Sequence, residues 1–316
     1  METLNNDMKI QKCIETRREF IKSTGLMLGA AAVVNTGMVS SIVSEAKPET
    51  VPKKINSGSR MIIDSHCHLK HGDKERTEYT PEVIVEVMDK AGIEKSIVFA
   101  MSTSTKDSIE RAEVAVKKFP DRLIPYAYAI PNYERSVLNE LETVLEKGLF
   151  RGIKLHISEC TLADYVTDPV LRVAGKYKVP CLIDLGGDLK AATRMVQSFP
   201  GTSFIIAHMG RYLSKDEKLL DSFITLAENF PNIFLDLSGV IIPEKIIEAV
   251  KRIGSLRMFW GIDGPHPEPN LVTNAQVIPD LISYAKKEFN RITQLNLKEE
   301  DENNILGQSI IRLLKL

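Results

Sequence analysis

The segment Asp64-Ser65-His66-Cys67-His68 places two imidazoles two residues apart at the end of a short apolar run. Side chains two residues apart in a β-strand point to the same face, so His66 and His68 can grip one cation together. Each ring would turn one neutral nitrogen to the ion and need a hydrogen-bonding partner on the other nitrogen. The spacing therefore predicts a metal site with His66 and His68 as two of its ligands.

Polar side chains recur at the ends of later apolar runs, at Lys154, His156, Asp184, His208 and Asp263. In parallel α/β barrels the catalytic groups come from the carboxyl ends of several strands, so we expect these residues to converge. A divalent ion there would lower the pKa of bound water to about 7. Asp263, beside the ion, could take up and return the proton.

Eight short apolar runs alternate with amphipathic stretches from residue 60 onward. The runs cover residues 61–66, 96–101, 123–130, 152–157, 180–185, 203–208, 233–237 and 258–262. Helical patterns lie between them, at residues 81–91, 109–119, 134–147, 169–177 and 216–230; Pro81 and Pro169 each follow a residue that can cap a helix. A doubly wound sheet would normally carry a glycine-rich loop after its first strand, where this chain has histidines. We therefore predict the α/β class and a single (β/α)8 TIM barrel over residues 60–316.

The first 46 residues have the order of an export signal. Arg17 and Arg18 precede a mildly apolar run at residues 26–34 that is too short to span a bilayer, and a small-residue cleavage site ends at Ala46. The arginine pair resembles a twin-arginine signal, which exports proteins already folded. We predict a signal peptide over residues 1–46, a flexible linker over 47–59, and an exported, periplasmic protein without stable membrane insertion after cleavage.

The composition narrows the classes of partner. The 316 residues are 43% hydrophobic and 26% charged with a formal net charge of −1, which is ordinary for a soluble globular protein. No basic block is interleaved with aromatic residues, so we expect a small-molecule substrate and no nucleic acid. The four cysteines form no C-x-x-C pair and predict no disulfide framework. Assembly into a homo-oligomer stays open.

Six strings resemble the amidohydrolase superfamily, in particular its amidohydrolase-related branch: IDSHCHL, RGIKLH, VPCLIDLG, FIIAHMG, NIFLDLSG and RMFWGIDGP. This branch includes dicarboxylate-lactone hydrolases and decarboxylases of the aminocarboxymuconate-semialdehyde type. The resemblance implies that His66, His68 and Asp263 bind a metal, that Asp263 also handles protons, and that His208 binds the metal or polarises the substrate. The implied cofactor is a divalent ion, with zinc as the first expectation and manganese, iron or magnesium as alternatives.

Asp184 departs from that resemblance, because family members usually carry His at this position. A carboxylate still supplies an oxygen ligand, so we expect Asp184 to bind the metal and to give the site a harder character. Lys154 could be carboxylated to bridge two metals or could pair with an anionic substrate; we expect it to bind substrate together with His156, for which a supporting hydrogen-bonding role is an equal alternative. His71 is expected to be solvated, and His266 is a weaker candidate for the pocket wall.

These residues predict a hydrolase that attacks an amide, ester or lactone bond of a small, carboxylate-bearing substrate with metal-activated water. Lys154 and the resemblance leave non-oxidative decarboxylation on the same metal as an alternative. A barrel whose site has decayed and only binds a ligand is a further alternative, which the unusual Asp184 suggests.

Overall fold

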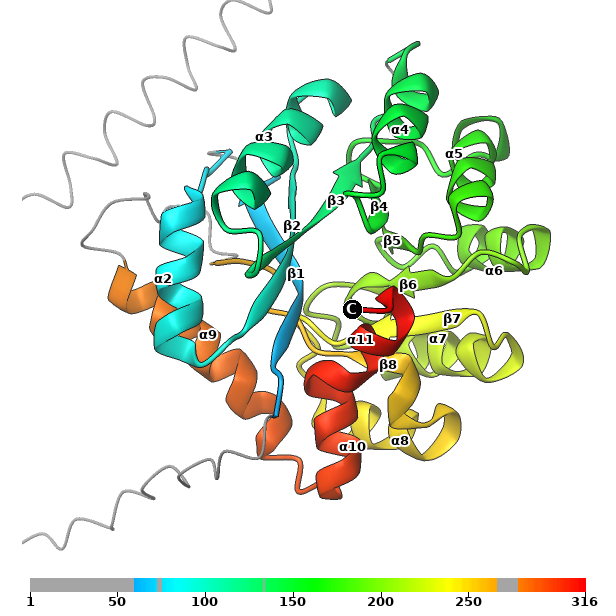
Figure 1. Cartoon of the computed structure of the whole chain (residues 1–316). Helices are drawn as coiled ribbons and strands as arrows, with labels where there is room; N and C mark the ends of the chain where they lie inside the picture. The colour runs from blue at the N-terminus through cyan, green and yellow to red at the C-terminus, as the bar shows by residue number, and fades with distance from the viewer. Residues whose placement is uncertain (1–59, 73–75, 133, 266–277) are drawn as a thin grey trace, which may run out of the picture. The chain divides into compact units, whose positions relative to one another are not determined.

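The structure is a computed structural model that describes residues 60–72, 76–132, 134–265 and 278–316 (Figure 1). The predicted signal peptide and linker lie outside the described residues, as does His266. Eight parallel strands pair in the order in which they follow one another in the sequence. They are β1 Ile63–Lys70, β2 Lys95–Ala100, β3 Leu123–Tyr128, β4 Gly152–His156, β5 Cys181–Asp184, β6 Phe204–Ile206, β7 Ile233–Asp236 and β8 Met258–Phe259.

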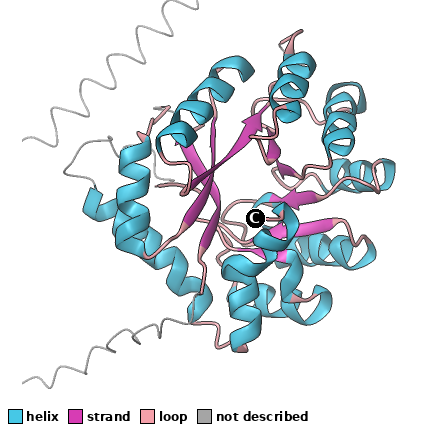
Figure 2. Cartoon of the chain, in the orientation of Figure 1, coloured by secondary structure: helices cyan, strands magenta, loops and turns pink. Residues whose placement is uncertain are grey.

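Helices alternate with the strands and surround them (Figure 2). They are α2 Pro81–Ala91, α3 Thr105–Lys118, α4 Val137–Glu146, α5 Asp164–Tyr177, α6 Leu189–Ser198, α7 Glu217–Asn229, α8 Pro243–Ile253, α9 Ile278–Thr293, α10 Glu299–Asn303 and α11 Ser309–Leu314. The start of α2 follows the predicted signal, because the Thr80 hydroxyl accepts from the Val83 amide and Pro81 occupies the first turn.

Backbone hydrogen bonds between the first and last strand regions close the ring. The Ser65 amide donates to the Trp260 carbonyl at 3.0 Å, and the Asp263 amide donates to the His66 carbonyl at 2.8 Å. The His68 amide also donates to the Gly264 carbonyl, at 2.6 Å. The predicted (β/α)8 barrel is therefore confirmed. Its closure brings His66 and His68 of the first strand next to Asp263, which follows the last strand.

Apolar side chains fill both sides of the strands. One buried cluster packs the strands against the surrounding helices, and a second fills the lumen with residues such as Ile97, Phe99 and Leu182. Ile310 and Leu314 of α11 belong to this lumen cluster and lie near the amino-terminal ends of the strands, with the C-terminus close to the middle of the ring (Figure 1). Side chains fill the barrel at the amino-terminal ends of the strands. A binding site is therefore expected at the opposite end, where the carboxyl ends of the strands lie.

Several predicted boundaries are wrong by a few residues, and two of them have a clear physical reason. Helix α5 begins at Asp164 and carries Pro169 in its interior, whereas the sequence predicted a start at Pro169. The helix tolerates this proline because the unpaired carbonyl belongs to Tyr165, which is largely exposed and open to water. Strand β6 ends at Ile206 rather than at His208, since Ala207–Gly210 forms a 3₁₀ turn. Within the described residues, no helix has the length and apolar character needed to cross a membrane.

Candidate metal centre at the carboxyl ends of the strands

His66 is held in one tautomer by a carboxylate on β7. Its Nδ1 lies 2.8 Å from Asp236 Oδ2, and both side chains are fully buried. Burial alone would raise the pKa of Asp236, but the charges and hydrogen bonds of His66 and its other neighbours lower it to about 2. Nδ1 must therefore donate to the ionised Asp236, which leaves the lone pair of Nε2 facing the lumen.

Asp236 is itself surrounded by donors. Its Oδ2 accepts from the Ser238 hydroxyl at 2.6 Å and from the His208 amide at 3.3 Å, and its Oδ1 accepts from the Ser238 amide at 3.1 Å. Gly261 leaves room for this arrangement, because a Cβ there would lie 2.8 Å from the His66 Cβ and 3.1 Å from Asp236 Oδ1. The carboxylate orients an imidazole from behind, as in the carboxylate–histidine pairs of metal sites.

His68 and Asp263 meet His66 at one point. Asp263 Oδ1 lies 3.1 Å from His66 Nε2 and 3.0 Å from His68 Nε2. Burial would raise the pKa of Asp263, but the neighbouring histidines hold it well below its usual range. Burial, and then the charge of Lys154, lowers the pKa of His66; burial, and then His71, lowers that of His68, so both imidazoles are neutral and able to act as ligands.

His208 enters the site from a strained turn. Its backbone is left-handed at φ 56°, and its Nδ1 donates to the Ser238 carbonyl at 2.9 Å. The Nε2 atom then faces two carboxylates, at 3.4 Å from Asp184 Oδ2 and 4.0 Å from Asp263 Oδ2. Burial opposes protonation, but Asp263 and Asp184 outweigh it and raise the pKa of His208 to about 9.

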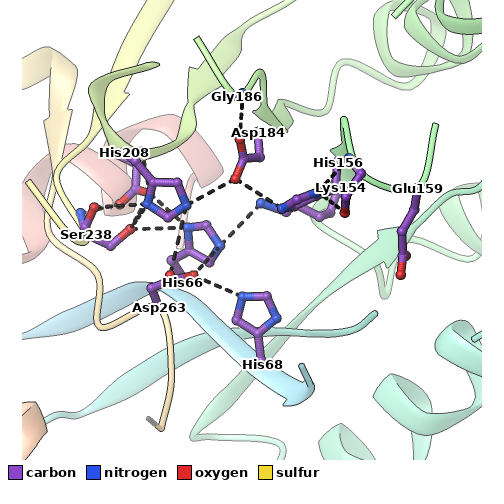
Figure 3. Close-up of polar contacts among 12 residues, drawn as sticks. His66, His68, Lys154, His156, Glu159, Asp184, Gly186, His208, Ser238 and Asp263 are labelled. Carbon is purple, nitrogen blue, oxygen red and sulfur yellow. Dashed lines mark hydrogen bonds and ion pairs between the residues drawn. The ribbon is translucent and has the colours of Figure 1, made fainter. Parts of the chain in front are cut away.

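Asp184 and His156 stand opposite each other on β5 and β4. His156 Nε2 lies 3.1 Å from Asp184 Oδ2, so the same carboxylate oxygen contacts two imidazoles (Figure 3). Asp184 therefore lies beside the His66, His68 and Asp263 cluster rather than within it. Burial would raise the pKa of Asp184, but hydrogen bonds from His156 and His208 hold it well below its usual range.

Lys154 is fully buried beside these groups. Its Nζ lies 3.2 Å from His66 Nε2 and 5.2 Å from the centroid of the Phe99 ring. Burial lowers its pKa, while Asp184 and Asp263 oppose that shift. Lys154 thus joins the predicted constellation but is not among the residues that line the cavity.

A cavity of about 510 Å³ opens onto the cluster. It is lined by His66, His68, His71, Gly72, Met101, His156, Ile157, Asp184, Gly186, His208, Arg211, Tyr212 and Asp263. The predicted residues His66, His68, His156, Asp184, His208 and Asp263 all reach it. The volume suits a small organic substrate.

Among the cavity residues that the sequence did not predict, three carry polar side chains. His71 was expected to be solvated, but its ring centroid lies 4.4 Å from that of His68 and it lines the cavity. Arg211 and Tyr212 follow His208 in the turn after β6, and the Tyr212 ring packs edge-on against His208 at 5.0 Å. Their place in a loop directly after a strand end was the signal that could have found them.

The donor atoms fit a divalent ion. The ligand atoms of His66, His68 and Asp263 all lie within 4.8 Å of one another, and a tetrahedral ion with bonds of about 2.0–2.1 Å would separate its donors by about 3.3 Å. Among the described residues, the buried Nδ1 of His68 has no hydrogen-bonding partner. The polar contact that orients this ring is the one between Nε2 and Asp263 Oδ1. In a second group, His66, His208 and Asp236, the carboxylate already accepts from the His66 ring and the His208 backbone amide, so this group supports the first.

A family model described as amidohydrolase matches residues 63–316, which include every residue of this cluster. The chain belongs to the amidohydrolase family. No curated protein sequence matches it closely enough to indicate a nearer relative. Solved structures also resemble the chain. Their sequence identity to it is low, so this resemblance shows only that the fold is shared.

Three of these structures illustrate the range. A probable 2-pyrone-4,6-dicarboxylic acid hydrolase from Acinetobacter baumannii, with citric acid bound, is 19% identical with a TM-score of 0.60, covering 81% of this chain and 99% of that one. A 5-carboxyvanillate decarboxylase from Novosphingobium aromaticivorans, complexed with manganese and a nitrobenzoic acid, is 14% identical with a TM-score of 0.61, covering 81% and 96%. A 2,6-dihydroxybenzoate decarboxylase from Rhizobium is 17% identical with a TM-score of 0.56, covering 81% and 99%.

Proposed function

We propose that this amidohydrolase is a metal-dependent hydrolase that cleaves an ester, lactone or amide bond in a small, carboxylate-bearing substrate. The convergence of His66 Nε2, His68 Nε2 and Asp263 Oδ1 at the cavity floor carries the proposal. A divalent ion held by these atoms would polarise the scissile carbonyl and acidify an attacking water. Zinc is the first candidate, and the carboxylates on the cavity wall also suit manganese, iron or magnesium.

The chain's own residues supply the proton chemistry. Asp263 is kept ionised by the surrounding histidines, so its carboxylate can orient a water and accept its proton. His208 lines the cavity with its Nε2 beside Asp184, and when that nitrogen is protonated it can donate to the oxygen or nitrogen of a leaving group.

Arg211 provides a second reason to propose an anionic substrate. Arg211 lines the cavity and is exposed, whereas Lys154 is fully buried beside His66. We assign the carboxylate of the free substrate first to Arg211, while Lys154 contributes positive charge from below. Arg211→Met should then raise KM with little change in kcat, whereas Lys154→Met should lower kcat as well. Equal effects of both variants on KM alone would contradict this division.

Non-oxidative decarboxylation is the second candidate, and buried Lys154 is the observation that favours it. An ammonium 3.2 Å from His66 Nε2 could stabilise negative charge that develops as a carboxylate leaves. The metal cluster and the positive charge of Arg211 would serve hydrolysis and decarboxylation equally well. The fold and the cluster therefore do not distinguish the two reactions.

Isotope labelling separates the two reactions. Metal-loaded protein would be incubated in ¹⁸O water with a panel of lactones, esters and amides bearing a carboxylate, and with aromatic and unsaturated carboxylic acids. Hydrolysis predicts ¹⁸O in the product acid and no carbon dioxide, and Asp263→Asn should abolish it. Carbon dioxide released without ¹⁸O incorporation would support the decarboxylase instead, and no turnover in the presence of bound metal would favour a ligand-binding barrel.

We also propose that residues 1–46 direct export through the twin-arginine route, on the basis of the sequence order described above. Replacing both Arg17 and Arg18 with Lys should retain the uncleaved precursor in the cytoplasm. Unchanged processing and export of that double variant would contradict the proposal.

A further inference from the structure

His156 and Asp184 form a pair on the wall of the cavity. They occupy matched positions on neighbouring strands, so strand pairing alone brings their side chains together. His156 Nε2 lies 3.1 Å from Asp184 Oδ2. In the Asp236 and His66 pair a carboxylate supports an imidazole. In the His156 and Asp184 pair an imidazole supports a carboxylate (Figure 3).

The turn after β4 fixes the tautomer of His156. The Ser158 amide donates to His156 Nδ1 at 3.1 Å, and the Ser158 hydroxyl lies 2.7 Å from the same nitrogen. A backbone N–H can only donate, so Nδ1 holds the lone pair and the ring proton resides on Nε2. That proton points at Asp184, and His156 is therefore a donor whose direction the main chain determines.

The other oxygen of Asp184 is fixed as well. The Gly186 amide donates to Asp184 Oδ1 at 2.9 Å, which turns Oδ2 toward the cavity. Oδ2 lies 3.4 Å from His208 Nε2, which itself lies 4.0 Å from Asp263 Oδ2. Asp184 and Asp263 thus stand on either side of His208, so their two carboxylates place negative charge on the same part of the cavity.

We propose that His156 is a positioning residue whose Nε2–H holds the Asp184 carboxylate beside the His66, His68 and Asp263 cluster, where it serves as a fourth protein ligand once the metal is bound. The inference rests on the proposed metal-dependent function, and it assigns His156 to the support of the ligand set rather than to the substrate. Removing such a partner from a metal ligand typically weakens metal binding by about 10- to 100-fold.

The test measures the Kd for manganese and for zinc by competition with a chelating indicator. His156→Asn and Asp184→Asn should each weaken binding by about 10- to 100-fold. His156→Gln should stay within about threefold of the parent, because its amide places an N–H close to the position of Nε2. Ser158→Ala should also match the parent, because the backbone donor remains. Far-ultraviolet circular dichroism and thermal unfolding confirm that the variants are folded.

The outcomes separate the inference from the function on which it rests. Parent-like binding by His156→Asn, or by Asp184→Asn, would overturn the positioning role while leaving the metal site intact. Equal losses in His156→Gln and His156→Asn would also overturn it, since restoring the donor would then restore nothing. Failure of the parent to bind either metal would overturn the proposed function.

The tautomer can be tested without metal. Nitrogen-15 chemical shifts of the His156 ring in the metal-free protein should show the proton on Nε2. A proton on Nδ1 would overturn the inference whatever the metal measurements show.

Discussion

Asp236 and Asp64 are two fully buried carboxyl groups near His66. We predict that replacement by Asn lowers stability and metal affinity at Asp236 but changes them little at Asp64. Asp236 accepts at Oδ2 from His66 Nδ1 and the His208 amide, and at Oδ1 from the Ser238 amide. The amide of Asn has a single acceptor oxygen, so in either orientation its NH₂ faces at least one N–H that cannot turn away. One buried donor is left unpaired.

This single unpaired donor sets the size of the expected loss of stability. An unpaired buried donor costs about 1–3 kcal/mol, so the free energy of unfolding of metal-free Asp236→Asn should fall by this amount. If the NH₂ faces His66, the imidazole adopts the opposite tautomer and turns a proton, rather than a lone pair, toward Asp263. Metal binding should then weaken by about 10- to 100-fold.

Asp64→Asn is the matched control. Asp64 Oδ1 accepts from the His66 and Ile262 amides at 3.0 and 2.9 Å, and Oδ2 lies 3.4 Å from the Ser96 hydroxyl, which can accept. Burial raises the pKa of Asp64 to about 8, so this group is mostly neutral near pH 6.5. An Asn keeps the acceptor oxygen for the two backbone amides and can donate to the Ser96 oxygen if that hydroxyl turns, so stability and metal affinity should stay closer to those of the parent than in Asp236→Asn.

The assay is urea denaturation of the chelator-treated proteins near pH 6.5, followed by metal titration of the same samples. The account predicts a lower unfolding free energy and weaker metal binding for Asp236→Asn alone. Equal losses in both variants would show that removing any buried carboxyl has the same effect. Parent-like stability together with parent-like metal binding in Asp236→Asn would refute the role proposed for this carboxylate.

Two further predictions concern His208 and Gly261. Because carboxylates raise the pKa of His208 to about 9, above the value of 6.5 for the free side chain, its charged form stabilises the metal-free fold below about pH 6.5, and this contribution is lost as the pH rises through 9. Urea denaturation across this range should show the decline in the parent and a smaller decline in His208→Gln; identical profiles would contradict it. A Cβ at Gly261 would lie 2.8 Å from the His66 Cβ, so Gly261→Ala should lower stability by about 1–3 kcal/mol and weaken metal binding, whereas unchanged metal binding would show that the pair can shift without loss.

The sequence predicted the barrel and most of its chemical groups because both depend on local pattern. Alternation within a strand was enough to place His66 and His68 on one face, and strand-end position was enough to select Asp263. The sequence did not select Asp236 as a site residue. Its contact with His66 depends on barrel closure, which brings β7 within reach of β1, and no local pattern contains that information.

Loop conformation accounts for most of what the sequence missed. The left-handed turn at His208 and Met209 follows from packing around Gly210, where a Cβ would lie 2.2 Å from the Phe223 ring. This turn carries Arg211 and Tyr212 to the cavity, and the loop after β1 brings His71 against His68 in the same way. Periodicity describes strands and helices, so it cannot place residues whose position is set by tertiary contacts.

The retention of metal by the purified protein tests the central claim most directly. Protein loaded with zinc or manganese and then desalted would be analysed for metal content, beside His68→Ala prepared in the same way. The account predicts about one equivalent of divalent metal in the parent, held by His66, His68 and Asp263, and a large loss in His68→Ala. A parent that retains no metal after loading, or a His68→Ala variant that retains as much as the parent, would contradict the account.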